Sequence, residues 1–242
     1  DEARRMLAGY YAQIAYIDEQ FGRLLRLLQE LEADHDTIVV YTSDHGDMLG
    51  SQGVQKKQLP YDESVRVPFM IRWPGHLKSG VRTSPMGLVD LPATLSSMAG
   101  ANGLAGAADT AGKDRSAWIA GSEPEDADRG ALVYNMVPCH QAEDRGETAG
   151  WYGMITSRYT YATWDDGTPF CLYDNETDPG QLYNLANDAS ASAIRRELHA
   201  RAIAEVERTG GAIVPWQERI RNLGLQEEWN RSQIAFGRNP LE

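Results

Sequence analysis

Residues 38–68 read IVVYTSDHGDMLGSQGVQKKQLPYDESVRVP, and the organisation of the chain follows from this stretch. The run Thr37 to Tyr41 is apolar without alternation, which is typical of a parallel strand buried on both faces. Asp44 and His45 come directly after it, at the carboxyl end of the predicted strand, where open α/β sheets bind their ligands. Gly46 then allows the backbone to turn tightly. The stretch therefore predicts a strand that leads into a site.

The residue types after this strand are those of a metal and anion site. Asp44 offers carboxylate oxygens and His45 an imidazole nitrogen, so together they can supply part of a divalent-metal shell. Lys56 and Lys57 follow in the same stretch, and a metal beside a lysine points to an anionic substrate. Two simpler interpretations stay open, because Asp-His-Gly is also an ordinary turn and paired lysines are also typical of a solvated loop. Asp62, Glu63 and Arg66 are interpreted mainly as an ion-paired supporting segment.

Several motifs in residues 43–75 occur in a fixed order: SDHG, a lysine four residues before YDES, and then RVPFMIRWPG. In this order they resemble the sulfatase family of the alkaline-phosphatase superfamily. The resemblance implies that Asp44 and His45 bind a metal, with Ca²⁺ favoured and Mg²⁺ or Mn²⁺ as alternatives, and that Lys57 holds the sulfate of a small anionic ester. Relatives with this spacing often have His at the position of Gln52, which leaves any proton transfer by this loop open.

The fold class expected from the sequence is α/β. Apolar residues at steps of three and four predict one long amphipathic helix from Glu2 to about Glu32, before the strand. Together with the resemblance, this predicts the carboxyl-terminal part of a mainly parallel sheet flanked by helices, in residues 1–100. Residues 101–130, rich in Ala, Gly and Asp, are predicted to be a linker. In residues 131–242, four short runs rich in Tyr, Trp, Val and Ile predict a smaller four-stranded antiparallel sheet, and the stripe in Ala191 to Val206 predicts a helix that covers it.

Composition excludes some partners. The chain has 242 residues, 42% of them hydrophobic, and a formal net charge of -12. Nucleic acids and anionic membranes require a basic surface, so neither is expected as a partner. A membrane span is not expected either, since no apolar stretch approaches the ~20 residues that cross a bilayer. Two cysteines without a CxxC pair leave the cellular compartment undetermined, periplasmic or cytoplasmic.

The catalytic nucleophile expected from the resemblance is missing. Sulfatases carry C-x-P-S-R or S-x-P-x-R, whose Cys or Ser becomes formylglycine, and neither Cys139 nor Cys171 lies in such a motif. Whether the two cysteines are buried thiols, a bridge or unpaired stays open. We therefore expect a fragment that is inactive alone, whose partner is the amino-terminal half of the same protein, and which otherwise self-associates. His140, in a polar loop, is interpreted mainly as a surface residue, with a substrate-side role as the alternative.

Three functions are compatible with this sequence. The first is hydrolysis of a sulfate ester, with the nucleophile supplied upstream. A phosphonate monoester or phosphodiester hydrolase of the same superfamily is the alternative, because similar metal residues serve both. A binding module that keeps the fold without catalysis is the third.

Overall fold

The computed structural model describes residues 1–101, 111–136 and 149–235. They form two compact units: residues 1–57 with 61–127, and residues 58–60 with 128–242. None of the described helices is long and apolar enough to cross a membrane.

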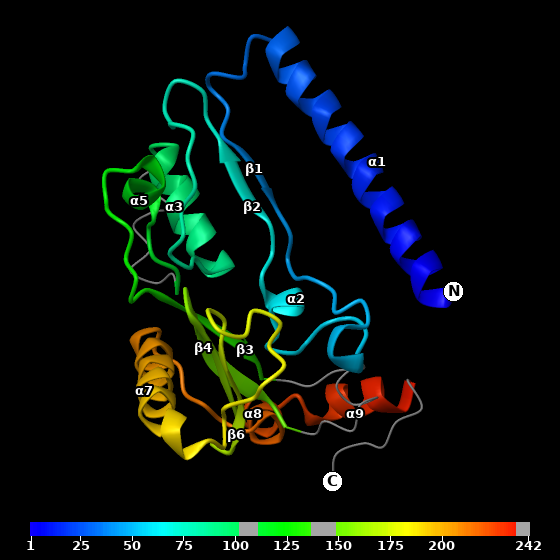
Figure 1. The fold of residues 1–242 in the computed structure, drawn as a ribbon, viewed down its shortest axis with the longest axis vertical. Helices are drawn as coiled ribbons and strands as arrows, with labels where there is room; N and C mark the ends of the chain where they lie inside the picture. The colour runs from blue at the N-terminus through cyan, green and yellow to red at the C-terminus, as the bar shows by residue number, and fades with distance from the viewer. Residues whose placement is uncertain (102–110, 137–148, 236–242) are drawn as a thin grey trace. The chain divides into compact units, whose positions relative to one another are not determined.

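The first unit begins with helix α1 (Glu2–Glu30) and strand β1 (Val39–Thr42). A 3-10 turn η1 (Ser51–Gly53) and the short helix α2 (Asp62–Val65) lie between β1 and β2 (Phe69–Arg72). It continues with η2 (Leu88–Asp90), α3 (Leu91–Met98) and α5 (Ser116–Ala120). These elements are coloured blue to green in Figure 1.

The pairing of β1 with β2 corrects one expectation from the sequence. The two strands run antiparallel, with Val39 opposite Arg72 and Thr42 opposite Phe69, so this pair is not part of the parallel arrangement that the sequence predicts for residues 1–100. A parallel return needs a crossover, usually a helix, and the connection here contains only one 3-10 turn and one turn of α-helix. Residues 39–41 of β1 are half-buried, not buried on both faces as predicted.

The predicted first helix is present, but its apolar stripe is exposed. Phe21 meets Tyr41 of β1 edge to face, with ring centroids 5.3 Å apart. No residue of helix α1 is buried. Its exposed large side chains include Tyr11, Ile14, Ile17 and Leu24. An exposed apolar face of this kind is a surface on which another segment or chain can pack.

An ion pair anchors the later part of the first unit. Asp90, at the start of α3, is buried and accepts from Arg115 Nε at 3.1 Å and from the backbone N–H of Lys113 at 2.8 Å. Thr94 Oγ1 accepts from the backbone N–H of Arg115 at 3.0 Å. These bonds hold residues 113–115 against α3, because a buried carboxylate is stable only when it is paired.

The second unit is built on the predicted four-stranded antiparallel sheet. Its strands are β3 (Gly130–Asn135), β4 (Trp151–Thr156), β5 (Tyr159–Trp164) and β6 (Pro169–Asp174), and neighbours in sequence are neighbours in the sheet. Alternation puts every second residue on the same face. After β6 come η3 (Ala189–Ala191), α7 (Ser192–Arg208), α8 (Trp216–Asn222) and α9 (Gln226–Ala235).

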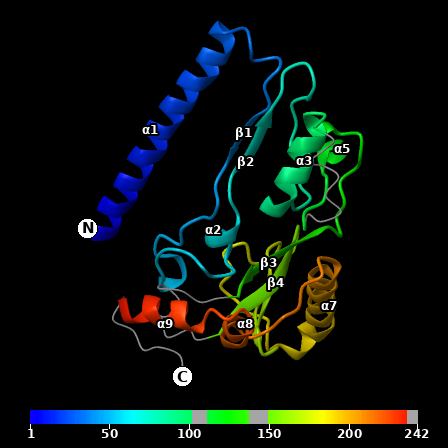
Figure 2. The ribbon, with the colours of Figure 1, turned by 180° about the vertical axis from the view of Figure 1, so that it is seen from behind.

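Helix α7 covers one face of this sheet, as the sequence predicts. Figures 1 and 2 show the helix beside β4 from opposite sides, and α7 packs on β4, β5 and β3. Leu198 and Ala202 of α7 form one buried cluster with Tyr152, Met154 and Leu172. Burial of each large side chain contributes about 1.5–3 kcal/mol, so this cluster stabilises the packing of α7 on the sheet.

Candidate functional site

The loop after β1 is shaped by its own polar side chains. Ser43 Oγ donates to the carbonyl of His45 at 2.9 Å, and the backbone N–H of His45 donates to Asp44 Oδ1 at 3.0 Å. Such local bonds are typical of Ser and Asp at turns. They fix the direction of the chain at the end of β1, where sequence analysis places the site.

Asp44 and His45 point toward each other. Asp44 Oδ2 lies 3.4 Å from His45 Nε2, and both side chains are exposed. His45 Nδ1 lies 2.8 Å from the carbonyl oxygen of Gly46. Because a carbonyl can only accept, Nδ1 carries the hydrogen, and the lone pair of a neutral ring is on Nε2, which faces the carboxylate. Two acceptors at this distance repel each other unless a proton or a cation lies between them.

The pKa of Asp44 reflects its position. Partial desolvation raises it, but the backbone N–H of His45 and the nearby His45 ring outweigh this and hold the pKa below its ordinary value. The carboxylate is thus ionised at neutral pH, as a metal ligand must be.

Gly46 joins this loop to the YDES segment. Its N–H donates to the carbonyl of Ser64 at 2.8 Å. A Cβ atom at Gly46 would lie 1.9 Å from the carbonyl oxygen of Glu63, a distance that no side chain could tolerate. Only glycine permits this approach of two backbones. Arg66, directly after α2, pairs with Asp62 in the first turn of that helix at 3.3 Å, in agreement with the interpretation of this segment as ion-paired support.

The two lysines differ in exposure. Lys56 is exposed and Lys57 is half-buried. Residues 47–56 form a closed loop in which Met48 N–H donates to the carbonyl of Lys56 at 2.6 Å. Gln52, at the tip, has a left-handed backbone (φ 55°). The loop thus returns the lysine pair to the neighbourhood of the residues after β1.

The described residues supply only part of a metal shell. Asp44 and His45 provide one oxygen and one nitrogen donor that converge and are accessible, and the bond from Nδ1 to a carbonyl is the usual outer partner of a metal-binding histidine. No cluster of three or more His, Cys, Asp or Glu side chains suited to a metal occurs among the described residues. The geometry of the pair therefore fits two positions in the shell of a cation, and the described residues do not group a third such side chain with it.

Of the two cysteines and His140, the structure describes only Cys171. Cys171 is a buried free thiol in β6, and burial raises its pKa to about 12. Cys139 and His140 lie outside the described residues.

The comparisons with known proteins agree with the motif order. Residues 1–101 match the family model described as Sulfatase. An ulvan-active sulfatase from Formosa agariphila is 36% identical over 208 residues, which are 82% of this chain and 38% of that enzyme. The chain belongs to the sulfatase family. It spans less than half the length of the curated relatives that it matches.

Solved structures share the sulfatase fold. A putative sulfatase from Bacteroides fragilis superposes with a TM-score of 0.71 at 27% identity, covering 84% of this chain and 43% of that one. The phosphonate monoester hydrolase of Agrobacterium radiobacter superposes with a TM-score of 0.66 at 25% identity, covering 83% and 41%. The α/β fold of the alkaline-phosphatase type is therefore confirmed.

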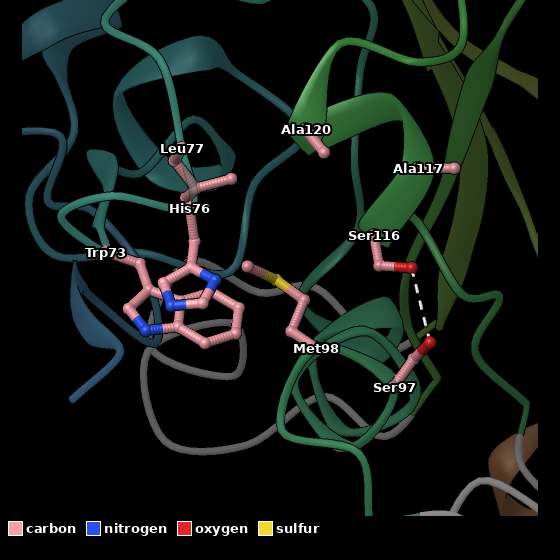
Figure 3. A pocket seen from close by; sticks show the side chains of 8 residues that line it. All are labelled: Trp73, His76, Leu77, Ser97, Met98, Ser116, Ala117 and Ala120. Carbon is pink, nitrogen blue, oxygen red and sulfur yellow. Dashed lines mark hydrogen bonds between the residues drawn. The ribbon is translucent and has the colours of Figure 1, made fainter. Parts of the chain in front are cut away.

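A shallow pocket of about 280 Å³ lies elsewhere in the first unit of this sulfatase-family chain (Figure 3). The indole of Trp73 stacks on His76 at 3.8 Å on one side, and Ser97 and Ser116 face each other at 3.3 Å on the other. Trp73 follows Arg72, whose partner Val39 begins β1, whereas Asp44 lies two residues beyond Thr42, the last residue of β1. The pocket and the Asp44–His45 pair are thus at opposite ends of the two-stranded ladder, and this pocket is not the candidate site.

Two residues that bond to the backbone beside the lysine pair were not predicted from the sequence. Asp47 accepts backbone hydrogen bonds inside the lysine loop, and Trp151 donates one to Gln58, directly after Lys57. Asp47 stands beside the motif and before Gly50, which is a turn signal. No signal in the sequence points to Trp151, because it lies 93 residues beyond its partner.

Proposed function

We propose that this chain carries part of the active site of a metal-dependent sulfate ester hydrolase. Asp44 and His45 are assigned as ligands of one divalent cation, and Lys57 as the contact of the sulfate group. The observation that carries the proposal is the approach of Asp44 Oδ2 to His45 Nε2, with Nδ1 already committed to the Gly46 carbonyl. Membership of the sulfatase family supports the reaction class.

The preferred cation is Ca²⁺, with Mg²⁺ and Mn²⁺ as alternatives. Calcium takes about six to eight ligands, mostly oxygen, so the two residues here are a minority of its shell. A bound cation would stabilise negative charge on the sulfuryl oxygens as the ester bond breaks. Lys57 would bind the same oxygens as a point charge, and the ionised Asp44 would balance the charge of the cation.

The nucleophile is assigned to formylglycine in a part of the full-length protein outside these 242 residues. This assignment follows from the absence of the nucleophile motif around Cys139 and Cys171. By the same reasoning, this chain alone hydrolyses no sulfate ester. Its partner is the amino-terminal half of the same protein, without which it is proposed to associate with itself.

A second candidate is a phosphonate monoester hydrolase, and the similarity to the Agrobacterium radiobacter enzyme favours it. Steady-state kinetics of the full-length protein on 4-nitrophenyl sulfate and on 4-nitrophenyl phenylphosphonate separate the two. We expect the higher kcat/KM on the sulfate ester, and loss of activity in EDTA that Ca²⁺ restores. A higher kcat/KM on the phosphonate would replace the first function by the second, and activity on neither would favour the non-catalytic module.

A further inference from the structure

Lys57 stands between two residues with an unusual backbone. Lys56 has φ 72° and Gln58 has φ 77°, in the left-handed region that residues with a side chain rarely occupy. Such a conformation is unfavourable for a residue with a side chain and persists only where surrounding contacts enforce it. The backbone on both sides of Lys57 must therefore be held by specific contacts.

The contact before Lys57 is made by Asp47. Its Oδ1 accepts from the backbone N–H of Leu49 at 2.9 Å and from that of Lys56 at 3.2 Å. Met48, the next residue, donates its N–H to the Lys56 carbonyl at 2.6 Å and is fully buried. Both backbone polar groups of Lys56 are thus bonded to the start of the same loop.

The contact after Lys57 is made by Trp151. Its Nε1 donates to the carbonyl of Gln58 at 2.9 Å, a bond within the second unit, to which residues 58–60 belong. Trp151 is only 3% exposed, and Leu59 next to Gln58 is 5% exposed. A buried indole N–H requires an acceptor, and here that acceptor is the residue that follows Lys57.

We propose that Asp47 and Trp151 are positioning residues for Lys57. They hold the peptide units on either side of the lysine in a strained conformation, and this limits the directions in which its ammonium group can reach. A group that is already ordered binds its ligand without the cost of ordering it first. The inference rests on the proposed role of Lys57 in anion binding and adds how that role is prepared.

Matched variants of the full-length protein test each contact. Trp151→Phe removes the N–H and keeps an aromatic ring. Its control is Trp164→Phe, the same substitution in strand β5, where the Trp164 ring stacks on Phe170 of β6 at 4.0 Å. Asp47→Ala removes the acceptor, whereas Asp47→Asn keeps an oxygen at this position. The affinity for inorganic sulfate is measured by calorimetry, and hydrogen exchange of the amides of residues 47–58 by mass spectrometry.

We expect Trp151→Phe and Asp47→Ala each to weaken sulfate binding about three- to tenfold, as the loss of one hydrogen bond would, and to speed exchange in residues 47–58. Asp47→Asn should lose less than Asp47→Ala, and Trp164→Phe should change neither measurement. For the ester substrate, KM should rise more than kcat falls. Unchanged exchange in both Trp151→Phe and Asp47→Ala would overturn the proposal.

A double-mutant cycle with Lys57→Ala separates this inference from the proposed function. In the Lys57→Ala background, Trp151→Phe and Asp47→Ala should weaken sulfate binding no further. Full additivity would show that they act on something other than Lys57 and would overturn the inference alone. Sulfate affinity unchanged by Lys57→Ala itself would instead remove the role of Lys57, and both proposals with it.

Discussion

The backbone N–H of Gly46 donates to the carbonyl of Ser64 at 2.8 Å, and this bond joins the two motifs of the candidate site. The loop that presents Asp44 and His45 is held directly against the segment that follows the lysines. The site is therefore a product of two backbones in contact, and a Cβ atom between them would separate them.

The first prediction concerns this contact. Gly46→Ala places a methyl group 1.9 Å from the Glu63 carbonyl, so one of the two segments must move. Forced overpacking of this kind costs about 1–3 kcal/mol. We expect the free energy of unfolding of the full-length protein, measured in urea, to fall by that amount, and its affinity for metal to fall as well. Gly80→Ala is the control, because nothing lies within 4 Å of its Cβ position. Equal effects of the two substitutions would contradict the prediction.

The lysine pair gives the second prediction. Lys57→Ala should weaken the binding of inorganic sulfate to the full-length protein by at least about tenfold, because a charged hydrogen bond is lost. Lys56→Ala, which removes an exposed side chain, should weaken it by less than about twofold. Isothermal calorimetry of both variants decides, and a larger loss in Lys56→Ala would mean that the other lysine binds the anion.

The third prediction is a pH dependence of stability. The Glu125 carboxylate accepts from the hydroxyl of Ser84 at 2.7 Å and from its backbone N–H at 2.8 Å. The Ser84 hydroxyl is the main cause that lowers the pKa of Glu125 to about 2, from an ordinary value of 4.5. Because the pKa of Glu125 is lower in the folded state, the ionised carboxylate stabilises that state at every pH above the pKa of the unfolded chain. This contribution is lost as the pH falls from 4.5 toward 2.

Glu125→Gln should therefore be less stable than the wild type at pH 7, and the difference should shrink as the pH approaches 2. The difference in stability is measured from urea unfolding midpoints at pH 7, 4.5 and 3. Glu123→Gln, at a neighbouring exposed carboxylate, is the control. A difference that stays constant over this range would contradict the assignment.

The fourth prediction concerns the apolar stripe of α1. Ile14 is 44% exposed and Leu24 58% exposed in this chain, and exposed apolar patches of this kind associate with partners or with one another. We expect residues 1–242 to form oligomers in size-exclusion chromatography with light scattering. The double variant with Ile14→Gln and Leu24→Gln should lower the average molar mass of the oligomers, whereas Glu19→Gln should leave it unchanged. A stable monomer of the unmodified chain would refute the prediction.

Local patterns in the sequence predicted the elements well. The three- and four-residue steps of Glu2 to Glu32 gave α1, and the Tyr- and Val-rich runs gave β3 to β6, because helix and strand leave different periods. Motif order located Asp44, His45 and Lys57 in one stretch. The direction of β2 was not predictable in this way, since it depends on what fills the connection from β1.

Long-range contacts and strained backbone conformations could not be predicted from the sequence either. The hydrogen bond from Trp151 to Gln58 spans 93 residues, and only the folded chain brings the two together. The left-handed backbones of Lys56 and Gln58 contradict local propensity, and they occur where surrounding contacts hold the loop. Such conflicts between local preference and structure are expected at functional sites.

The central claim, that Asp44 belongs to a metal-assisted sulfate ester hydrolase, is tested most directly by sulfate release. The full-length protein and its Asp44→Asn variant are incubated with 4-nitrophenyl sulfate and Ca²⁺, and inorganic sulfate is measured by ion chromatography. Asn keeps the size of the side chain but removes the charge that balances the cation. We predict release by the wild type and a loss of at least about a hundredfold in kcat/KM in the variant, the upper range for loss of a metal-site interaction. Equal release by both proteins would contradict the account.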